Sequence, residues 1–116
     1  MGSYSFPKSV RLLNRKDFVN LNRRGKRCYT PHFTVIYQRN DLGASRLGVT
    51  VGRKIGNAVK RNKVKRLVRE IFRLHQSRLP QSYDIQIVAK MGADGLDFRT
   101  VKEELGEFFS DKEFRS

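Results

Sequence analysis

Residues 53–73 read RKIGNAVKRNKVKRLVREIFR and decide the fold. Apolar side chains recur there at intervals of three and four, the spacing of one helix face; they are Val64, Leu67, Val68, Ile71 and Phe72. Asn57 is a favourable N-cap, Gly56 permits a sharp turn before it, and Pro80 closes the segment. The pattern predicts a helix over residues 57–77 with its apolar stripe on a core.

The same segment is strongly basic, with nine Lys or Arg residues and Glu70 as its only acid. At 100° per residue, the side opposite the apolar stripe carries Asn62, Arg66, Arg69 and Arg73. Lys60, Arg61 and Lys63 occupy the first turn, where the helix dipole disfavours cations. Cations beside free backbone N–H groups indicate a phosphate-binding surface. The alternative is an ordinary solvated basic face.

Working outward, residues 32–38 and 47–54 have the composition and alternation of strands, separated by a turn at 39–45. We expect these two strands to pair as an antiparallel hairpin. Residues 83–90 predict a third strand, parallel to 47–54 if the two are neighbours. Shorter helices are predicted over residues 14–24, capped by Asn14, and 98–109, capped by Asp97. The order predicts an α+β domain, a small mixed sheet packed with three helices.

The charge balance restricts the partners. The chain has 25 Lys and Arg against 11 Asp and Glu, a net charge of +14. A polyanion would relieve the resulting self-repulsion, so nucleic acid is the first expectation and an anionic membrane surface the second. Seven of the acids follow residue 90, which places the binding surface in the first ninety residues.

We expect one domain over residues 1–116, with Met1-Gly2-Ser3 as an expression scar and the order of residues 111–116 left open. Cys28 is the only cysteine, which suits a reducing compartment. The N-terminus lacks the pattern of a secretory signal, and no apolar run has the length of a membrane span. These features predict a cytoplasmic protein.

Residues 54–70 resemble the signature of the bacterial ribonuclease P protein family. Arg11-Leu12 with Asp17-Phe18 is similar to the family's N-terminal helix, residues 46–54 to its central strand, and residues 87–90 to the strand after the long helix. The resemblance implies an α-β sandwich like the second domain of ribosomal protein S5. It also implies a non-catalytic subunit of an endoribonuclease, whose catalyst is a large RNA holding Mg²⁺. The implied partners are ribonuclease P RNA and precursor tRNA, with no membrane and no obligate protein partner.

The resemblance also implies two sets of site residues. Those facing the catalytic RNA are Lys60, Arg61, Asn62, Lys63, Lys65, Arg66, Arg69 and Arg73. The single-stranded 5′ leader of the precursor would lie in a cleft between the sheet and the N-terminal helix, against Phe18, Asn22, Tyr37, Arg53, Lys54 and Lys90. Lys63 stands where the family usually has Arg, and lysine presents a point charge in place of a bidentate fork. Asn22 stands where relatives often have an aromatic residue.

Other side chains favour no separate site. His32, His75 and Cys28 lack the spacing of metal ligands, so no metal is expected in the protein. Glu103, Glu104 and Glu107 are interpreted as a solvated helix face. Three alternatives stay open: a structural protein that binds ribosomal RNA, a protein-only nuclease, and a DNA-binding module. A structural RNA-binding protein needs no aromatic groove, and a protein-only nuclease needs clustered carboxylates. A DNA-binding module fits the aromatic strand less well.

Overall fold

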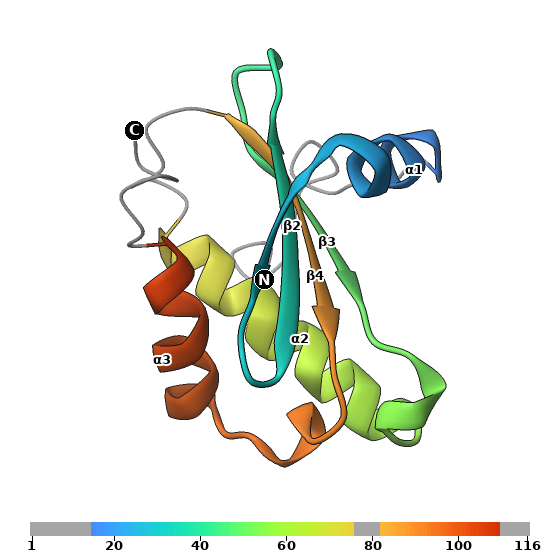
Figure 1. The fold of residues 1–116 in the computed structure, drawn as a ribbon. Helices are drawn as coiled ribbons and strands as arrows, with labels where there is room; N and C mark the ends of the chain where they lie inside the picture. Colours follow the sequence, from blue (N-terminus) through green and yellow to red (C-terminus); the bar gives the residue numbers. More distant parts are fainter. Residues whose placement is uncertain (1–14, 76–81, 110–116) are drawn as a thin grey trace, which may run out of the picture.

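A four-stranded sheet forms the centre of the molecule (Figure 1). The computed structural model describes residues 15–75 and 82–109. The helices are α1 (Arg15–Arg24), α2 (Ala58–His75) and α3 (Phe98–Phe109), and the strands are β1 (Lys26–Tyr29), β2 (Phe33–Arg39), β3 (Arg46–Thr50) and β4 (Tyr83–Ala89). Short 3-10 turns lie at Arg53–Ile55 and Ala93–Gly95. The predicted α+β class, with three helices and a mixed sheet, is confirmed.

Two of the three predicted helix caps lie within the described residues, and both are present. Asn57 Oδ1 accepts a hydrogen bond from the Lys60 N–H at 3.0 Å at the start of α2. Asp97 Oδ1 accepts one from the Thr100 N–H at 2.9 Å at the start of α3, and this bond lowers the pKa of Asp97. The scar at residues 1–3, the cap at Asn14, the helix end at 76–77 and the tail at 111–116 lie outside the described residues.

The strand order corrects two expectations. The order is β1-β2-β4-β3, with β3 parallel to β4 and the other pairs antiparallel. The expected hairpin between β2 and β3 is therefore wrong, because β4 lies between them. The strand before the long helix is an edge strand and not a central one. Three successive residues of β4, Ile85, Gln86 and Ile87, are buried. This burial suits an interior strand, which has a neighbouring strand at each edge and other elements packed on both faces.

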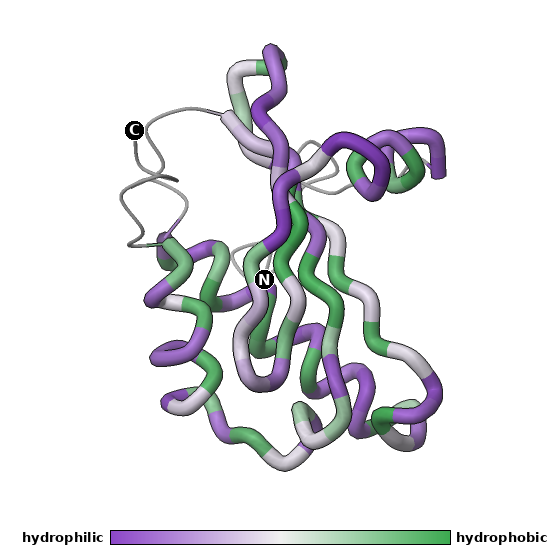
Figure 2. Tube along the Cα trace, in the orientation of Figure 1, coloured by the Kyte–Doolittle hydropathy of each residue, from purple (hydrophilic) through white to green (hydrophobic). Residues whose placement is uncertain are grey.

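The two faces of the sheet are covered differently. Alternate strand residues, including Phe33, Val35, Ile85 and Ile87, form the main core with α2 and α3. Figure 2 shows hydrophobic stretches along the strands and hydrophobic residues interspersed with hydrophilic ones along both helices. The other face, here the α1 face, packs against α1 through a second small cluster of Leu21, Ile36 and Phe18. It is formed by Arg27, Tyr29, Thr34, Ile36, Gln38, Arg46, Gly48, Thr50, Asp84, Gln86 and Val88.

None of the helices in the described ranges is both long and apolar enough to cross a membrane.

Candidate RNA interface

The basic ridge of α2 lies on the outer side of the helix. Val64, Val68, Ile71 and Phe72 are buried against the core. The predicted RNA-facing residues turn away from it: Lys60, Asn62, Arg66, Arg69 and Arg73 are exposed, and Arg61, Lys63 and Lys65 are half-buried. The structure therefore brings all eight together on one helix.

Two members of the ridge have acidic neighbours. The Lys60 Nζ lies 3.9 Å from Asp94 Oδ2, which is a loose ion pair because 57% of the lysine side chain is exposed. Arg73 Nε donates to Glu70 Oε1 at 3.1 Å, and this pair lowers the pKa of Glu70. Arg61 differs, because its Nε is buried and has no hydrogen-bond partner among the described residues. The first turn of α2 thus holds a guanidinium, that of Arg61, whose hydrogen-bond donors are not all satisfied by the described residues.

The predicted leader residues do not share one surface. Phe18 is half-buried on α1 and packs on Ile36, a residue of the α1 face. Tyr37 is the next residue along β2, so its side chain lies on the opposite face. Its ring makes edge contacts with Phe108 and Tyr83, at centroid distances of 5.2 and 6.2 Å. The structure therefore separates Phe18 from Tyr37 by the sheet, and it is Ile36 that belongs to the cluster against which Phe18 packs.

Tyr37 instead lines a small pocket with residues of α1, β1, β2 and β4. The pocket has a volume of about 240 Å³, and its remaining lining residues are Arg24, Lys26, Gln38, Arg39 and Tyr83. Asn22 lies on α1 and is exposed, but its Nδ2 donates to the Phe18 carbonyl at 3.0 Å. The Nδ2 group of Asn22 is therefore hydrogen-bonded within its own helix.

The three basic residues predicted near the leader lie at the end of the sheet where β3 and β4 finish. Arg53 and Lys54 are exposed in the 3-10 turn that follows β3. Lys90 follows β4 and is half-buried; its Nζ donates to the Thr30 carbonyl at 2.7 Å. Because β3 and β4 are parallel, these three residues leave the sheet at the same end.

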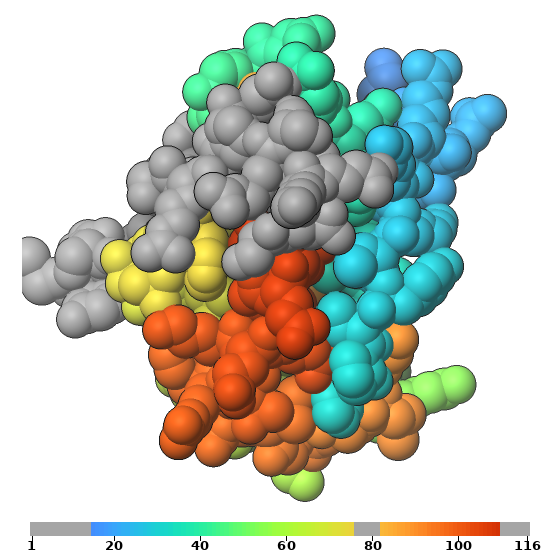
Figure 3. Space-filling view, turned by 60° about the vertical axis from the view of Figure 1, so that its left-hand side comes forward, coloured from blue at the N-terminus to red at the C-terminus, as the bar shows by residue number. Residues whose placement is uncertain are grey.

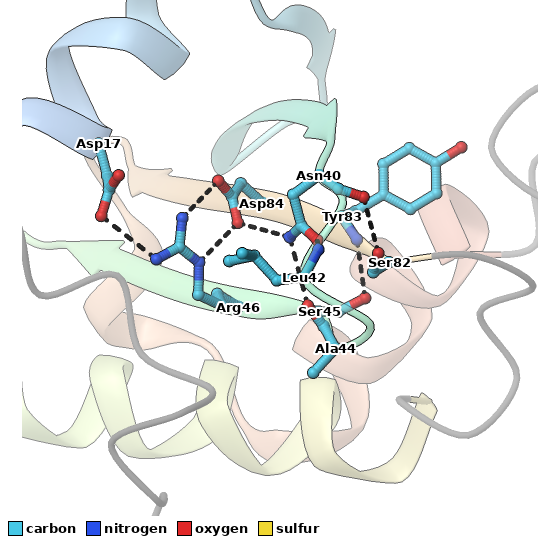
Figure 4. Close-up of polar contacts among 9 residues, drawn as sticks. All are labelled: Asp17, Asn40, Leu42, Ala44, Ser45, Arg46, Ser82, Tyr83 and Asp84. Atoms are coloured by element: carbon cyan, nitrogen blue, oxygen red, sulfur yellow. Dashed lines mark hydrogen bonds and ion pairs between the residues drawn. The ribbon is translucent and has the colours of Figure 1, made fainter.

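A polar network fixes α1 on its face of the sheet (Figure 4). Arg46 on β3 binds Asp84 on β4 through two hydrogen bonds of 2.8 Å, a bidentate pair that raises the pKa of the guanidinium. Its Nη1 also lies 3.3 Å from Asp17 Oδ2 on α1. Asn40 Nδ2 donates to Asp84 at 2.7 Å from the loop after β2. One guanidinium thereby ties α1 to two strands.

A second network anchors the turn between β1 and β2 to α3. Glu104 accepts hydrogen bonds from the Thr30 hydroxyl, the His32 N–H and the His32 Nδ1, and its side chain is 8% exposed. Burial alone would raise the pKa of Glu104, but the bonds from Thr30 and His32 outweigh it and lower the pKa. Figure 3 shows this turn against α3. Glu104 is a structural anchor, so the interpretation of it as a solvated residue is wrong.

Sequence reasoning missed β1 and with it an aromatic residue. Residues 26–29 read KRCY, a short basic run without the apolar alternation of a strand. Register places Tyr29 opposite Thr34 and Arg27 opposite Ile36, on the α1 face. Tyr29 is 68% exposed. An aromatic residue inside a basic run was the available signal.

Within residues 15–75 and 82–109, no three His, Cys, Asp or Glu side chains gather where they could hold a metal ion.

Comparison with known proteins identifies the family. The sequence model of the ribonuclease P family matches residues 6–113. A ribonuclease P protein component from Desulforapulum autotrophicum is 43% identical over 94% of this chain and 93% of its own, and one from Syntrophus aciditrophicus is 45% identical over 91% and 89%.

Solved structures agree. The RNase P protein of Staphylococcus aureus matches with a TM-score of 0.85 at 29% identity, over 94% of this chain and 100% of that one. The RNase P protein of Thermotoga maritima matches with a TM-score of 0.78 at 38% identity, over 85% and 94%. Because the family model, the relatives and the fold agree, the chain belongs to the ribonuclease P protein component family, part of a tRNA-processing ribonuclease.

Proposed function

We propose that this chain binds the catalytic RNA of ribonuclease P through α2 and the single-stranded 5′ leader of precursor tRNA on the α1 face. It thereby assists the Mg²⁺-dependent removal of the leader that yields the mature 5′ end. The observation that carries the proposal is the separation of two RNA-suited surfaces by one sheet. The basic ridge of α2 lies on one side, and aromatic and polar residues lie on the other.

The α2 ridge suits a structured RNA. Its cations project from a helix whose inner side is fixed in the core, so the backbone needs no ordering when they meet phosphates, and each phosphate that they neutralise releases counterions. The first turn adds free backbone N–H groups and the positive end of the helix dipole. Lys60, Arg61 and Lys63 stand at this end, where the helix dipole disfavours cations.

The α1 face suits an unpaired strand. Proteins that bind single-stranded RNA stack bases on aromatic rings and hydrogen-bond their edges. Phe18 supplies a half-buried ring, and Thr34 and Thr50 supply hydroxyl groups along the sheet. At the centre of the face, Gln86 Nε2 donates to Thr50 Oγ1 at 3.0 Å, while Gln86 Oε1 has no partner among the described residues. We therefore assign Phe18 to the leader surface and leave Tyr37 out of it.

We assign the Mg²⁺ ions to the partner RNA. Both proposed RNA surfaces of this chain carry cations, which repel a divalent metal, and Asp84, Glu70 and Asp94 near them pair with arginine or lysine. In this proposal, no protein side chain takes part in breaking the bond. The chain's residues bind and orient, and the chemistry belongs to the RNA that they hold.

Exchanging Phe18 for leucine tests the leader surface. Phe18→Leu keeps apolar packing on Leu21 and Ile36 but removes the ring. With a reconstituted holoenzyme, we expect binding of precursor tRNA to weaken by about 1–3 kcal/mol, the scale of one stacked base, and binding of mature tRNA to stay unchanged. Titration of both RNAs measures the difference.

Tyr37→Leu is the matched control, because it removes a ring from the sheet face opposite to the one on which Phe18 packs. We expect it to leave the preference for precursor over mature tRNA unaltered. Equal weakening of both RNAs by Phe18→Leu would contradict a leader surface and would favour a structural RNA-binding protein.

A further inference from the structure

Tyr29 is an exposed aromatic ring on the surface proposed for the leader. It ends β1, and 68% of the residue is accessible to solvent. Its partner in the sheet is Thr34, two residues along β2 from Ile36, against which Phe18 packs. Two residues of a strand span about 7 Å. Tyr29 and Phe18 therefore lie on the same face but at successive places along it.

A single exposed tyrosine is common and needs no function. This ring, however, is held by a cation. The Lys90 Nζ lies 5.5 Å from the centre of the Tyr29 ring and donates to the Thr30 carbonyl at 2.7 Å. The backbone N–H of Lys90 also donates to the His32 carbonyl at 2.8 Å. Lys90 is thus held both at its backbone N–H and at its ammonium group, and the ammonium group restricts the ring beside it.

The turn that carries the ring is fixed as well. Glu104 on α3 accepts hydrogen bonds from Thr30 and from His32, the residues on either side of Pro31. The Thr30 N–H donates to the Phe33 carbonyl at 2.8 Å, which closes the turn. A ring on a fixed turn loses little freedom when a ligand stacks on it, so more of the stacking energy becomes affinity.

We propose that Tyr29, positioned by Lys90, is a second base-stacking platform that binds one nucleotide of the leader at a different place from Phe18. This inference rests on the leader surface proposed above. Stacking tolerates any base, and the nearby ammonium group and Arg27 complement the phosphates on either side of that nucleotide. The nucleotide lies towards the end of the sheet at which Arg53 and Lys54 emerge.

The test uses precursor tRNAs that each carry a single 2-aminopurine at one leader position, bound to the reconstituted holoenzyme and measured before cleavage. Stacking on a ring quenches the fluorescence of this base. Tyr29→Ala is expected to relieve quenching at one position, and Phe18→Leu at a different one. Tyr29→Ala should also weaken precursor binding about 5- to 150-fold and leave mature tRNA binding unchanged. Tyr29→Phe, which keeps the ring, should behave as the original chain.

Lys90→Met tests the positioning role. It should relieve quenching at the same leader position as Tyr29→Ala, and the two changes combined should do no more there than Tyr29→Ala alone. An effect of Lys90→Met that is spread evenly over all leader positions would show that Lys90 acts only as a charge.

The outcomes separate the two proposals. If Tyr29→Ala leaves the quenching profile and the affinity unchanged while Phe18→Leu alters them, the Tyr29 platform is refuted and the leader surface stands. If no leader position is quenched and precursor and mature tRNA bind equally, the leader surface itself fails.

Discussion

Replacing Arg61 and Arg66 by alanine is expected to weaken binding to ribonuclease P RNA roughly 100-fold or more. Each guanidinium that bonds a phosphate contributes about 1.5–3 kcal/mol as a charged hydrogen bond, so the loss of two gives at least this factor. Arg66 is exposed opposite the core, and Arg61 has a buried Nε without a partner in the described part of the chain. Neither guanidinium forms an ion pair within the described residues, so the unfolding transition should change little.

The salt dependence of the same binding gives an independent readout. Each lost phosphate contact should reduce the slope of log affinity against log salt by about one, hence by about two for the double variant. Arg99→Ala with Lys102→Ala is the matched control, since it removes two exposed cations from α3. Equal losses for the two pairs would mean that net charge alone drives binding, and that the α2 ridge is not the interface.

Replacing Arg46 by alanine is expected to destabilise the fold by about 2–4 kcal/mol. The guanidinium is 19% exposed and pairs with Asp84, which is 16% exposed, and with Asp17. Its removal leaves two carboxylates facing each other without their cation, and the breaking of a largely buried pair is costly. Chemical denaturation measures the change in the free energy of unfolding.

Arg73→Ala is the control for this prediction. Arg73 also forms an ion pair with an acid, but its side chain is 44% exposed and the pair joins neighbouring turns of one helix. Such pairs contribute about 0.3–0.5 kcal/mol. Because Asp17 belongs to α1, Arg46→Ala should also reduce the preference for precursor over mature tRNA. A change in stability no larger than that of Arg73→Ala would contradict the anchoring of α1 by Arg46.

The helices were predictable because their signals are local. The apolar spacing in residues 53–73 gave α2 to within a residue of its start, and Asn57 and Asp97 capped their helices as expected. The order of the strands was not predictable in this way, because pairing depends on contacts between distant residues. The turn at 39–45 suggested a hairpin, but β4, from beyond α2, takes the place beside β2.

In the candidate site, too, the features with local sequence signals were predictable and those that depend on distant contacts were not. The basic ridge follows from helix periodicity alone, and the structure gathers its eight residues on α2. The α1 face depends on strand alternation, where a shift of one residue reverses the face. The resemblance implied one cleft for Phe18 and Tyr37, whereas Ile36, one residue earlier on β2, belongs to the face that packs against Phe18. Glu104 and Tyr29 gain their roles from contacts across the fold, with Thr30 and with Lys90, which no local pattern contains.

The central claim is that the chain supports an RNA catalyst and is not itself the catalyst. The most direct measurement mixes it with a transcribed bacterial ribonuclease P RNA and precursor tRNA at low millimolar Mg²⁺, where the RNA alone should be nearly inactive. We expect the chain to restore removal of the 5′ leader and to do nothing without the RNA. Binding without any restored cleavage, or cleavage by the chain alone, would contradict the account.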